Sequence, residues 1–251
     1  NADIACHMAK AQGRNSTHIY SSQRDEKSAM DLELGWSNRL HSALDKDNFH
    51  LYYQPIVPLH ELDLDNLPED GNLSEILANS NCCSTYEVLI RMHNSHGEPI
   101  SPNAFLPTAE RFNMMRDIDS WVINSAMKQM AELGPENNDI TFTINLSGQS
   151  LDPEILVPLF KKCMQKYNLA ANRFLFEITE PCAINDMYSA TKLIDELSKL
   201  GCRFALDDFG SGYCSFSHLK RLPVDYIKID GMFVKDIVND PMDMAIIRSI
   251  T

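Results

Sequence analysis

The chain has 251 residues, of which 44% are hydrophobic and 23% charged, proportions that are ordinary for a soluble globular protein. Its formal net charge of −13 argues against a protein that holds nucleic-acid polymers by their phosphate backbone. The sequence contains no apolar run of about 18 residues and no signal peptide. We therefore expect a cytoplasmic chain, or the cytoplasmic part of a membrane-anchored protein. Seven cysteines without a C-x-x-C pair indicate reduced thiols and not a disulfide framework.

The first 47 residues are expected to lead into the main domain. Helical spacing followed by Gly13 and the strand-like "THIY" predicts the end of an upstream domain over residues 1–20. A polar joint, "SSQRDEKSA", comes next. A second helical pattern then follows, and it predicts a linker helix within residues 21–47. The residues expected on one face of this helix are Met30, Leu34, Ser37, Leu40 and Leu44.

From Phe49 onward, strand-like and helix-like segments alternate, which predicts βαβ units and a mainly parallel sheet. The expected strands are residues 49–57, 85–92, 139–147, 173–180, 202–210 and 224–230. The expected helices are residues 102–112, 118–133, 153–168, 187–201 and 242–251. A long acidic segment at residues 60–84 interrupts the alternation. It has two interpretations, a calcium-binding loop and a solvated insertion, and its spacing departs from that of an EF-hand.

Polar or charged side chains interrupt the apolar run of each strand after the first. In a parallel β/α barrel the C-terminal strand ends converge on one mouth, where active sites lie. We therefore expect these side chains to come together. They are Glu87 and Arg91, then Asn145, then Glu177 and Glu180, then Asp207 and Asp208, and finally Lys228.

The chemistry of this set indicates a site for hard divalent cations. Carboxylate and amide oxygens suit Mg²⁺ or Mn²⁺, and the absence of His and Cys from the set argues against zinc. His93 and His96 are expected in a surface loop. Two adjacent carboxylates, Asp207 and Asp208, favour a pair of cations that clamps the oxygens of a phosphoryl displacement. The alternative is a barrel whose mouth residues only form salt bridges, for example Lys228 with Asp208.

These motifs together resemble the EAL domain family, bacterial phosphodiesterases that hydrolyse cyclic di-GMP. The matching stretches are "YYQPIV", "YEVLIR", "FLPTAERFN", "INLS", "FEITE" and "DDFGSGYCSFSHLKRLPVDYIKIDGMFV". The start of the chain resembles the last helix of a GGDEF (diguanylate cyclase) domain. The resemblance implies a GGDEF remnant at 1–20, a linker helix at 21–47 and an EAL barrel at 48–251, with its first strand antiparallel to the rest.

The family also implies a role for each matching residue. Glu87, Asn145, Glu177, Asp207 and Asp208 match its metal ligands for two Mg²⁺ or Mn²⁺ ions. Lys228 matches the lysine near the attacking water, and we expect Lys228, Asp208 and Glu87 to be catalytic. Gln54 and Arg91 match substrate-binding positions. Glu180 matches the glutamate that positions the loop after the fifth strand, a loop that takes part in dimerisation.

The expected function is hydrolysis of cyclic di-GMP to the linear dinucleotide pGpG in bacterial signalling. The expected partners are cyclic di-GMP, a second copy in a homodimer, and upstream GGDEF and sensory domains. A catalytically impaired EAL domain that acts as a cyclic di-GMP receptor or scaffold is the alternative. The signature reads Glu87-Val88-Leu89 where the family has Glu-Ala-Leu. Since strands seven and eight would follow Thr251, the barrel formed by these 251 residues is expected to be incomplete, and these residues alone to be poorly stable and weakly active.

Overall fold

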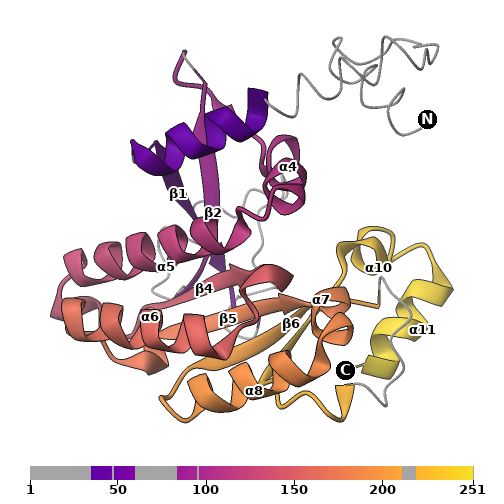
Figure 1. The fold of residues 1–251 in the computed structure, drawn as a ribbon. Coiled ribbons are helices and arrows are strands. Elements are labelled where there is room, and N and C mark those ends of the chain that lie inside the picture. The colour runs from indigo at the N-terminus through magenta and orange to yellow at the C-terminus, as the bar shows by residue number, and fades with distance from the viewer. Residues whose placement is uncertain (1–34, 47, 60–83, 95, 211–218, 251) are drawn as a thin grey trace, which may run out of the picture. The chain divides into compact units, whose positions relative to one another are not determined.

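The computed structural model describes residues 35–46, 48–59, 84–94, 96–210 and 219–250 (Figure 1). All six predicted strands and the five predicted helices between and after them are present in these ranges. The strands are β1 (Phe49–Ile56), β2 (Thr85–His93), β3 (Pro99–Ile100), β4 (Thr141–Leu146), β5 (Phe174–Thr179), β6 (Arg203–Phe209) and β7 (Tyr226–Ile229). The α-helices are α4 (Leu106–Arg111), α5 (Met115–Glu132), α6 (Pro153–Tyr167), α7 (Glu180–Asn185), α8 (Met187–Ser198), α10 (Gly231–Lys235) and α11 (Pro241–Ile250). Short 3₁₀ helices are Pro102–Ala104, Pro135–Asn137, Gly148–Ser150 and Ala171–Arg173.

The strands form a seven-stranded sheet in the order β1-β2-β4-β5-β6-β7, with β3 paired to β2. The pairs from β2 with β4 through β6 with β7 are parallel, as the sequence predicts. The short strand β3 is antiparallel to β2 and was not predicted. The antiparallel direction of the first strand stays a prediction. The parallel strands therefore bring their C-terminal ends to one edge, where the polar residues lie.

The chain divides into two compact units, each described here by itself. The first comprises Asn1–His50 and Arg91–Met114, and the second comprises Leu51–Ile90 and Met115–Thr251. All of the predicted upstream remnant at 1–20, the start of the linker helix and nearly all of the acidic segment fall outside the described residues. So does most of the loop after the fifth strand, residues 211–218.

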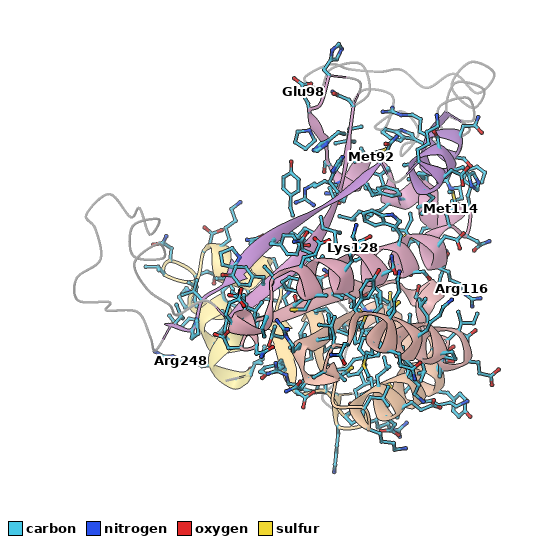
Figure 2. All side chains as sticks on the ribbon, turned by 90° about the vertical axis from the view of Figure 1, so that its left-hand side faces the viewer. Met92, Glu98, Met114, Arg116, Lys128 and Arg248 are labelled. Carbon is cyan, nitrogen blue, oxygen red and sulfur yellow. The ribbon has the colours of Figure 1, made fainter. Side chains whose placement is uncertain are left out.

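In the first unit, residues 35–45 are helical, as the helical pattern predicts, and the role of this helix as a linker stays a prediction. Its buried residues, Ser37, Leu40 and Ala43, are spaced three apart, as expected for one helix face. Figure 2 labels Glu98 and Met92, which lie on either side of the turn that joins β2 to β3. His93 ends β2, so its expected place in a loop is wrong, and its ring lies 4.1 Å from that of His50.

In the second unit, helices α5, α6 and α8 cover one face of strands β4, β5 and β6 (Figure 1). Helix α6 follows its sequence signals, because Asp152 caps its first turn through the Glu154 N–H and Asn168 ends it in a left-handed conformation. Under the helices lies an aromatic core in which Phe160 packs edge-on against Phe174 and Phe176, with centroids 5.7 and 5.4 Å apart. This core fixes the strands whose ends carry the polar residues.

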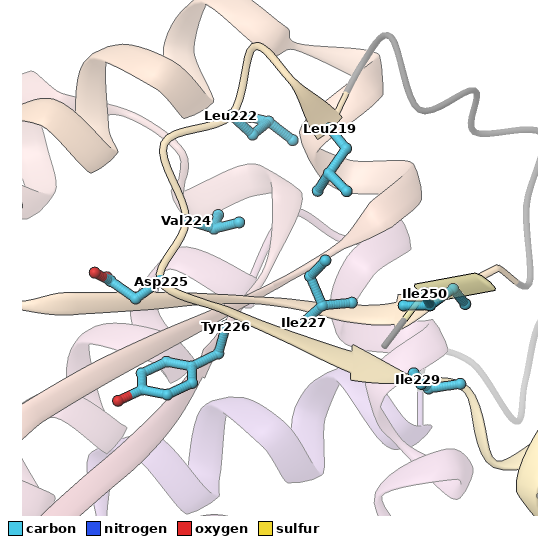
Figure 3. A pocket seen from close by; sticks show the side chains of 8 residues that line it. All are labelled: Leu219, Leu222, Val224, Asp225, Tyr226, Ile227, Ile229 and Ile250. Carbon is cyan, nitrogen blue, oxygen red and sulfur yellow. The ribbon is translucent and has the colours of Figure 1, made fainter. Parts of the chain in front are cut away.

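An apolar groove of about 350 Å³ runs beside β7. Leu222 and Val224 line it before the strand, Ile227 and Ile229 line it from the strand, and Ile250 lines it from α11 (Figure 3). Among the helices of the described ranges, none is long and apolar enough to cross a membrane.

Candidate active site

Lys228 on β7 lies among three carboxylates that come from three other strands. Its Nζ donates to Glu177 Oε2 at 2.5 Å, to Glu87 Oε2 at 3.3 Å and to Asp207 Oδ2 at 3.4 Å. Asn145 joins the group because its Nδ2 donates to Glu87 Oε1 at 2.9 Å. The structure therefore brings together residues that are as many as 141 positions apart in the sequence.

The register of the parallel strands explains this convergence. Asn145 on β4 is the direct partner of Glu177 on β5, so both side chains point to the same face of the sheet. In the next pair of strands, Thr179 of β5 is opposite Asp207 of β6, so these two side chains also share one face of the sheet. A cavity of about 230 Å³ also reaches Glu177 and Lys228, and it is lined by the residues that begin β2, β4 and β6: Thr85, Thr141 and Arg203.

A β-bulge-like irregularity in the pairing of β6 with β7 explains how the side chains of two adjacent aspartates can point toward one site. Neighbouring residues of a regular strand point to opposite faces. In β6, however, three residue steps from Leu206 to Phe209 face two steps on β7, from Ile227 to Ile229. Within this irregularity Asp208 has a φ of 53°, a conformation that few residues other than glycine adopt. The extra residue re-aims Asp208 relative to Asp207, and strained backbone of this kind clusters at functional sites.

Glu177 is the most buried carboxylate of the cluster, with 1% of its surface exposed. Burial raises its pKa, and the Lys228 ammonium opposes that rise without cancelling it. Its Oε1 is buried without a well-formed hydrogen bond among the described residues, and the nearby Thr143 hydroxyl lowers the pKa of Glu177 only in part. A carboxylate oxygen in this state is costly unless a further positive charge or donor approaches it.

Lys228 is held in its charged form. Burial alone lowers its pKa, but the hydrogen bond and charge of Glu177, followed by the charges of Glu87 and Asp207, outweigh burial and raise the pKa. The lysine is therefore a permanent cation at neutral pH and is unsuited to act as a base.

Asp208 is exposed, and its carboxyl group lies in a field of like charges. Its pKa is raised, first by burial and then by the charges of Asp207 and Asp230, while Lys228 acts in the opposite direction. Asp230, which directly follows β7, was not singled out from the sequence. Its side chain also accepts from the Met232 N–H at 2.7 Å at the start of α10. The site thus has an excess of negative charge that a divalent cation would relieve.

Glu180 begins α7 and is 1% exposed. Its Oε2 accepts the Gly210 N–H at 2.9 Å, at the point where β6 leads into the loop. Gly210 has a φ of 95°, and a Cβ there would lie 2.8 Å from a ring carbon of Phe233. This contact supports the loop-positioning role expected for Glu180, which stays a prediction.

The sequence also predicts two residues that bind substrate, Gln54 and Arg91. Gln54 is exposed on β1, and Arg91 belongs to the first unit, at the C-terminal part of β2. Their roles toward a substrate stay predictions.

The donor set fits a hard divalent cation. The carboxylates of Glu87, Glu177 and Asp207, together with the Asn145 amide, are oxygen ligands of the kind that Mg²⁺ and Mn²⁺ prefer. The buried Glu177 Oε1 is a donor atom of this set. In the described part of the chain no three His, Cys, Asp or Glu side chains are grouped closely enough to hold a metal ion, and the Lys228 ammonium contacts three of the carboxylates.

Salt bridges of the kind that the alternative expects are present, but their partners differ from the example of Lys228 with Asp208. Lys228 pairs most closely with Glu177, at 2.5 Å, and not with Asp208. Ion pairing and metal binding are compatible here, since a lysine beside metal ligands supplies a further charge for an anionic substrate.

The family described as the EAL domain matches residues 76–251. The chain is 37% identical over 250 residues to the cyclic di-GMP phosphodiesterase PdeB of Shewanella oneidensis, covering 100% of this chain and 27% of that protein. It is 32% identical over 239 residues to the cyclic di-GMP phosphodiesterase PdeF of Escherichia coli, covering 95% of this chain and 28% of that protein. The chain thus spans little more than a quarter of either relative.

A solved structure has the same fold. The FimX EAL domain from Pseudomonas aeruginosa, bound to cyclic di-GMP, matches with a TM-score of 0.70 and 30% identity, covering 86% of this chain and 78% of that one. This likeness confirms the barrel-type α/β class predicted from the alternating elements. The family match extends over most of the chain, from before β2 to its last residue. This protein therefore belongs to the EAL domain family.

Proposed function

We propose that the chain is a cyclic di-GMP phosphodiesterase domain that hydrolyses its substrate to pGpG. The observation that carries the proposal is the cluster in which Lys228 meets Glu177, Glu87 and Asp207, with Asn145 hydrogen-bonded to Glu87. Membership of the EAL family and the activity named for PdeB and PdeF support it.

Five side chains would hold two Mg²⁺ or Mn²⁺ ions in this site. They are Glu87, Asn145, Glu177, Asp207 and Asp208. When bound, such cations polarise a phosphoryl oxygen and make a water molecule more acidic. The negative field of these side chains attracts the cations, and the buried Glu177 oxygen gains a partner by binding one. With an overall charge of −13, the protein needs such positive charge to hold a dianionic dinucleotide.

Lys228 supplies the fixed positive charge of the site. Three carboxylates orient its ammonium and keep it protonated, so that it attracts a phosphate oxygen and stabilises the charge that builds up during displacement. Gln54 and Arg91 are proposed to bind the nucleotide, and Arg91 offers a guanidinium suited to phosphate.

The reaction consumes one water molecule for each bond broken. The water oxygen forms a bond to phosphorus, the bond from phosphorus to the 3′-oxygen breaks in line, and that oxygen takes up a proton. The product is a linear dinucleotide with a 5′-phosphate. The side chains contribute by positioning the reactants and balancing charge.

We also propose which domains and partner subunit accompany this domain in the full-length protein. We infer an upstream GGDEF domain and sensory region, a homodimer formed through the EAL domain, and action in the cytoplasm. The relative MucR of Pseudomonas aeruginosa, which is 31% identical, is named as a bifunctional diguanylate cyclase and cyclic di-GMP phosphodiesterase.

The proposal is tested by following cyclic di-GMP in the presence of the full-length protein by chromatography. We expect pGpG with Mn²⁺ and none with a chelator, and Glu177→Gln should be at least ~100-fold slower. Glu154→Gln is the matched control, because Glu154 is 84% exposed and lies on α6 away from the cluster. Equal rates for Glu177→Gln and Glu154→Gln would refute the proposed site.

A further inference from the structure

Asp119 is a buried carboxylate outside the cluster. It lies on the inward face of α5, is 5% exposed, and has the buried apolar residues Ile118, Val122 and Ile123 as neighbours on its helix. A buried charge in apolar surroundings is costly unless it is well hydrogen-bonded. Packing against the apolar core does not offset this cost, so hydrogen bonds to Asp119 must do so.

One oxygen of Asp119 accepts three hydrogen bonds from the segment that follows β4. Its Oδ2 accepts from the Ser147 N–H at 2.9 Å, from the Ser147 hydroxyl at 2.6 Å and from the Ser150 hydroxyl at 2.6 Å. Bonds to a charged acceptor are stronger and more directional than neutral ones. The carboxylate thus fixes both the backbone and the side chains of this turn.

Arg116, one helical turn before Asp119, holds the same segment from its other side. Figure 2 labels this residue near the start of α5. Its Nε donates to the Gln149 carbonyl at 2.6 Å, and its Nη2 lies 3.5 Å from Asp152 Oδ2 at the cap of α6. Two residues spaced three apart on one helix therefore anchor the whole stretch 147–152.

The anchored segment begins two residues after Asn145. Asn145 is the residue of β4 that contacts the cluster, because its Nδ2 donates to Glu87 Oε1 at 2.9 Å. Because Leu146 between them is 3% exposed and packed, the backbone has little freedom between Asn145 and Ser147. The orientation of the Asn145 amide consequently depends on where Ser147 is held.

We propose that Asp119 is a positioning residue that acts through Ser147 and Asn145 to set the affinity of the cluster for its divalent cation. This inference rests on the proposed function, because it takes Asn145 to be a cation ligand. Groups that hold a metal ligand in place typically change metal affinity by 10–100-fold when they are altered.

The test measures Mn²⁺ binding to the full-length protein by calorimetry, without substrate. We expect the Mn²⁺ dissociation constant to rise about 10-fold in Asp119→Asn and about 3-fold in Ser150→Ala. Ser120→Ala is the control and should stay within about twofold, because the Ser120 hydroxyl donates only to the Arg116 carbonyl within α5. Thermal unfolding of each variant separates a loss of fold from a loss of affinity.

A second measurement distinguishes positioning from general support of the fold. In an Asn145→Ala background, adding Asp119→Asn should change the Mn²⁺ dissociation constant less than about twofold, since the route through Asn145 is already cut. A further 10-fold loss there would overturn the inference. So would unchanged affinity in Asp119→Asn, or, should that variant not fold, in Ser150→Ala. Wild-type protein that binds no Mn²⁺ would overturn the proposed function as well.

Discussion

Lys228 and an incoming divalent cation would compete for the same carboxylates, so replacing the lysine should change cation affinity and turnover in opposite directions. Its ammonium contacts Glu177, Glu87 and Asp207, so it both neutralises the site and opposes an incoming cation. We expect Lys228→Met to bind Mn²⁺ more tightly than the wild type while cyclic di-GMP turnover falls at least ~100-fold. Lys192→Met, at an exposed position on α8, should change neither quantity. A parallel loss of affinity and turnover would show that Lys228 mainly holds the carboxylates in place.

Asp119 should affect the pH dependence of stability. Burial raises its pKa above the usual carboxyl value, and the bonds from Ser147 and Ser150 only partly oppose this. A group with a raised pKa in the folded state contributes most stability below its unfolded pKa and loses that contribution as pH rises through the folded value. Relative to Asp119→Asn, the wild type should therefore gain free energy of unfolding as pH is lowered from neutral. Urea unfolding of both proteins across this range measures the difference, and a constant difference would contradict the assignment.

At the scale of single residues, the sequence predicted which side chains come together but not how they are arranged. The strand-end positions of Asp207 and Asp208 could be predicted because the apolar run before them is unambiguous. The bulge that re-aims Asp208 could not, since it depends on the pairing of β6 with β7. Asp119 carried only a weak signal, an acidic residue on an apolar helix face, and its serine partners lie 28 and 31 residues away.

The elements of the second unit depend on the aromatic core. Phe176 on β5 is fully buried and contacts Phe160 of α6 and Phe204 of β6, with centroids 5.4 and 5.7 Å apart. Phe176→Ala should lower the free energy of unfolding by about 3–5 kcal/mol, because it leaves a cavity beside Phe160 and Phe204. Tyr188→Ala on α8, where the ring is 77% exposed, should cost less than about 0.5 kcal/mol. Denaturant unfolding of the two variants checks this contrast, and similar losses would mean that the core lies elsewhere.

The long elements were predictable and the short ones were not. Helices α5 and α6 and strands β4 to β6 carry enough apolar positions to show their period. The strand β3 has two residues and exists because β2 offers it a pairing edge. Helices α7 and α10 have six and five residues, too few to display a helical period.

On the scale of the whole molecule, an apolar groove lies beside β7 in the described part of the 251-residue chain. Its lining includes Leu222, Ile227 and Ile250. We expect an apolar dye such as anilinonaphthalene sulfonate to bind there and Ile250→Lys to reduce its fluorescence. Ile155→Lys is the matched control, because Ile155 is 47% exposed on α6 and does not line the groove. Equal fluorescence in the two variants would place the dye elsewhere.

The sequence motifs predicted the family, and the alternating elements predicted the fold class, because both depend on local patterns. The division into two units and the ion pairing of Lys228 come from contacts between distant segments, up to 141 residues apart, and needed the structure.

The central claim is that this cluster cleaves cyclic di-GMP and does not merely hold it. The most direct measurement mixes an excess of full-length protein with cyclic di-GMP and Mn²⁺ in ¹⁸O-labelled water, then quenches samples over time. We expect the bound nucleotide to convert to pGpG within one turnover, with one labelled oxygen in the new 5′-phosphate. Nucleotide that binds but stays cyclic would contradict the account and identify the domain as a receptor.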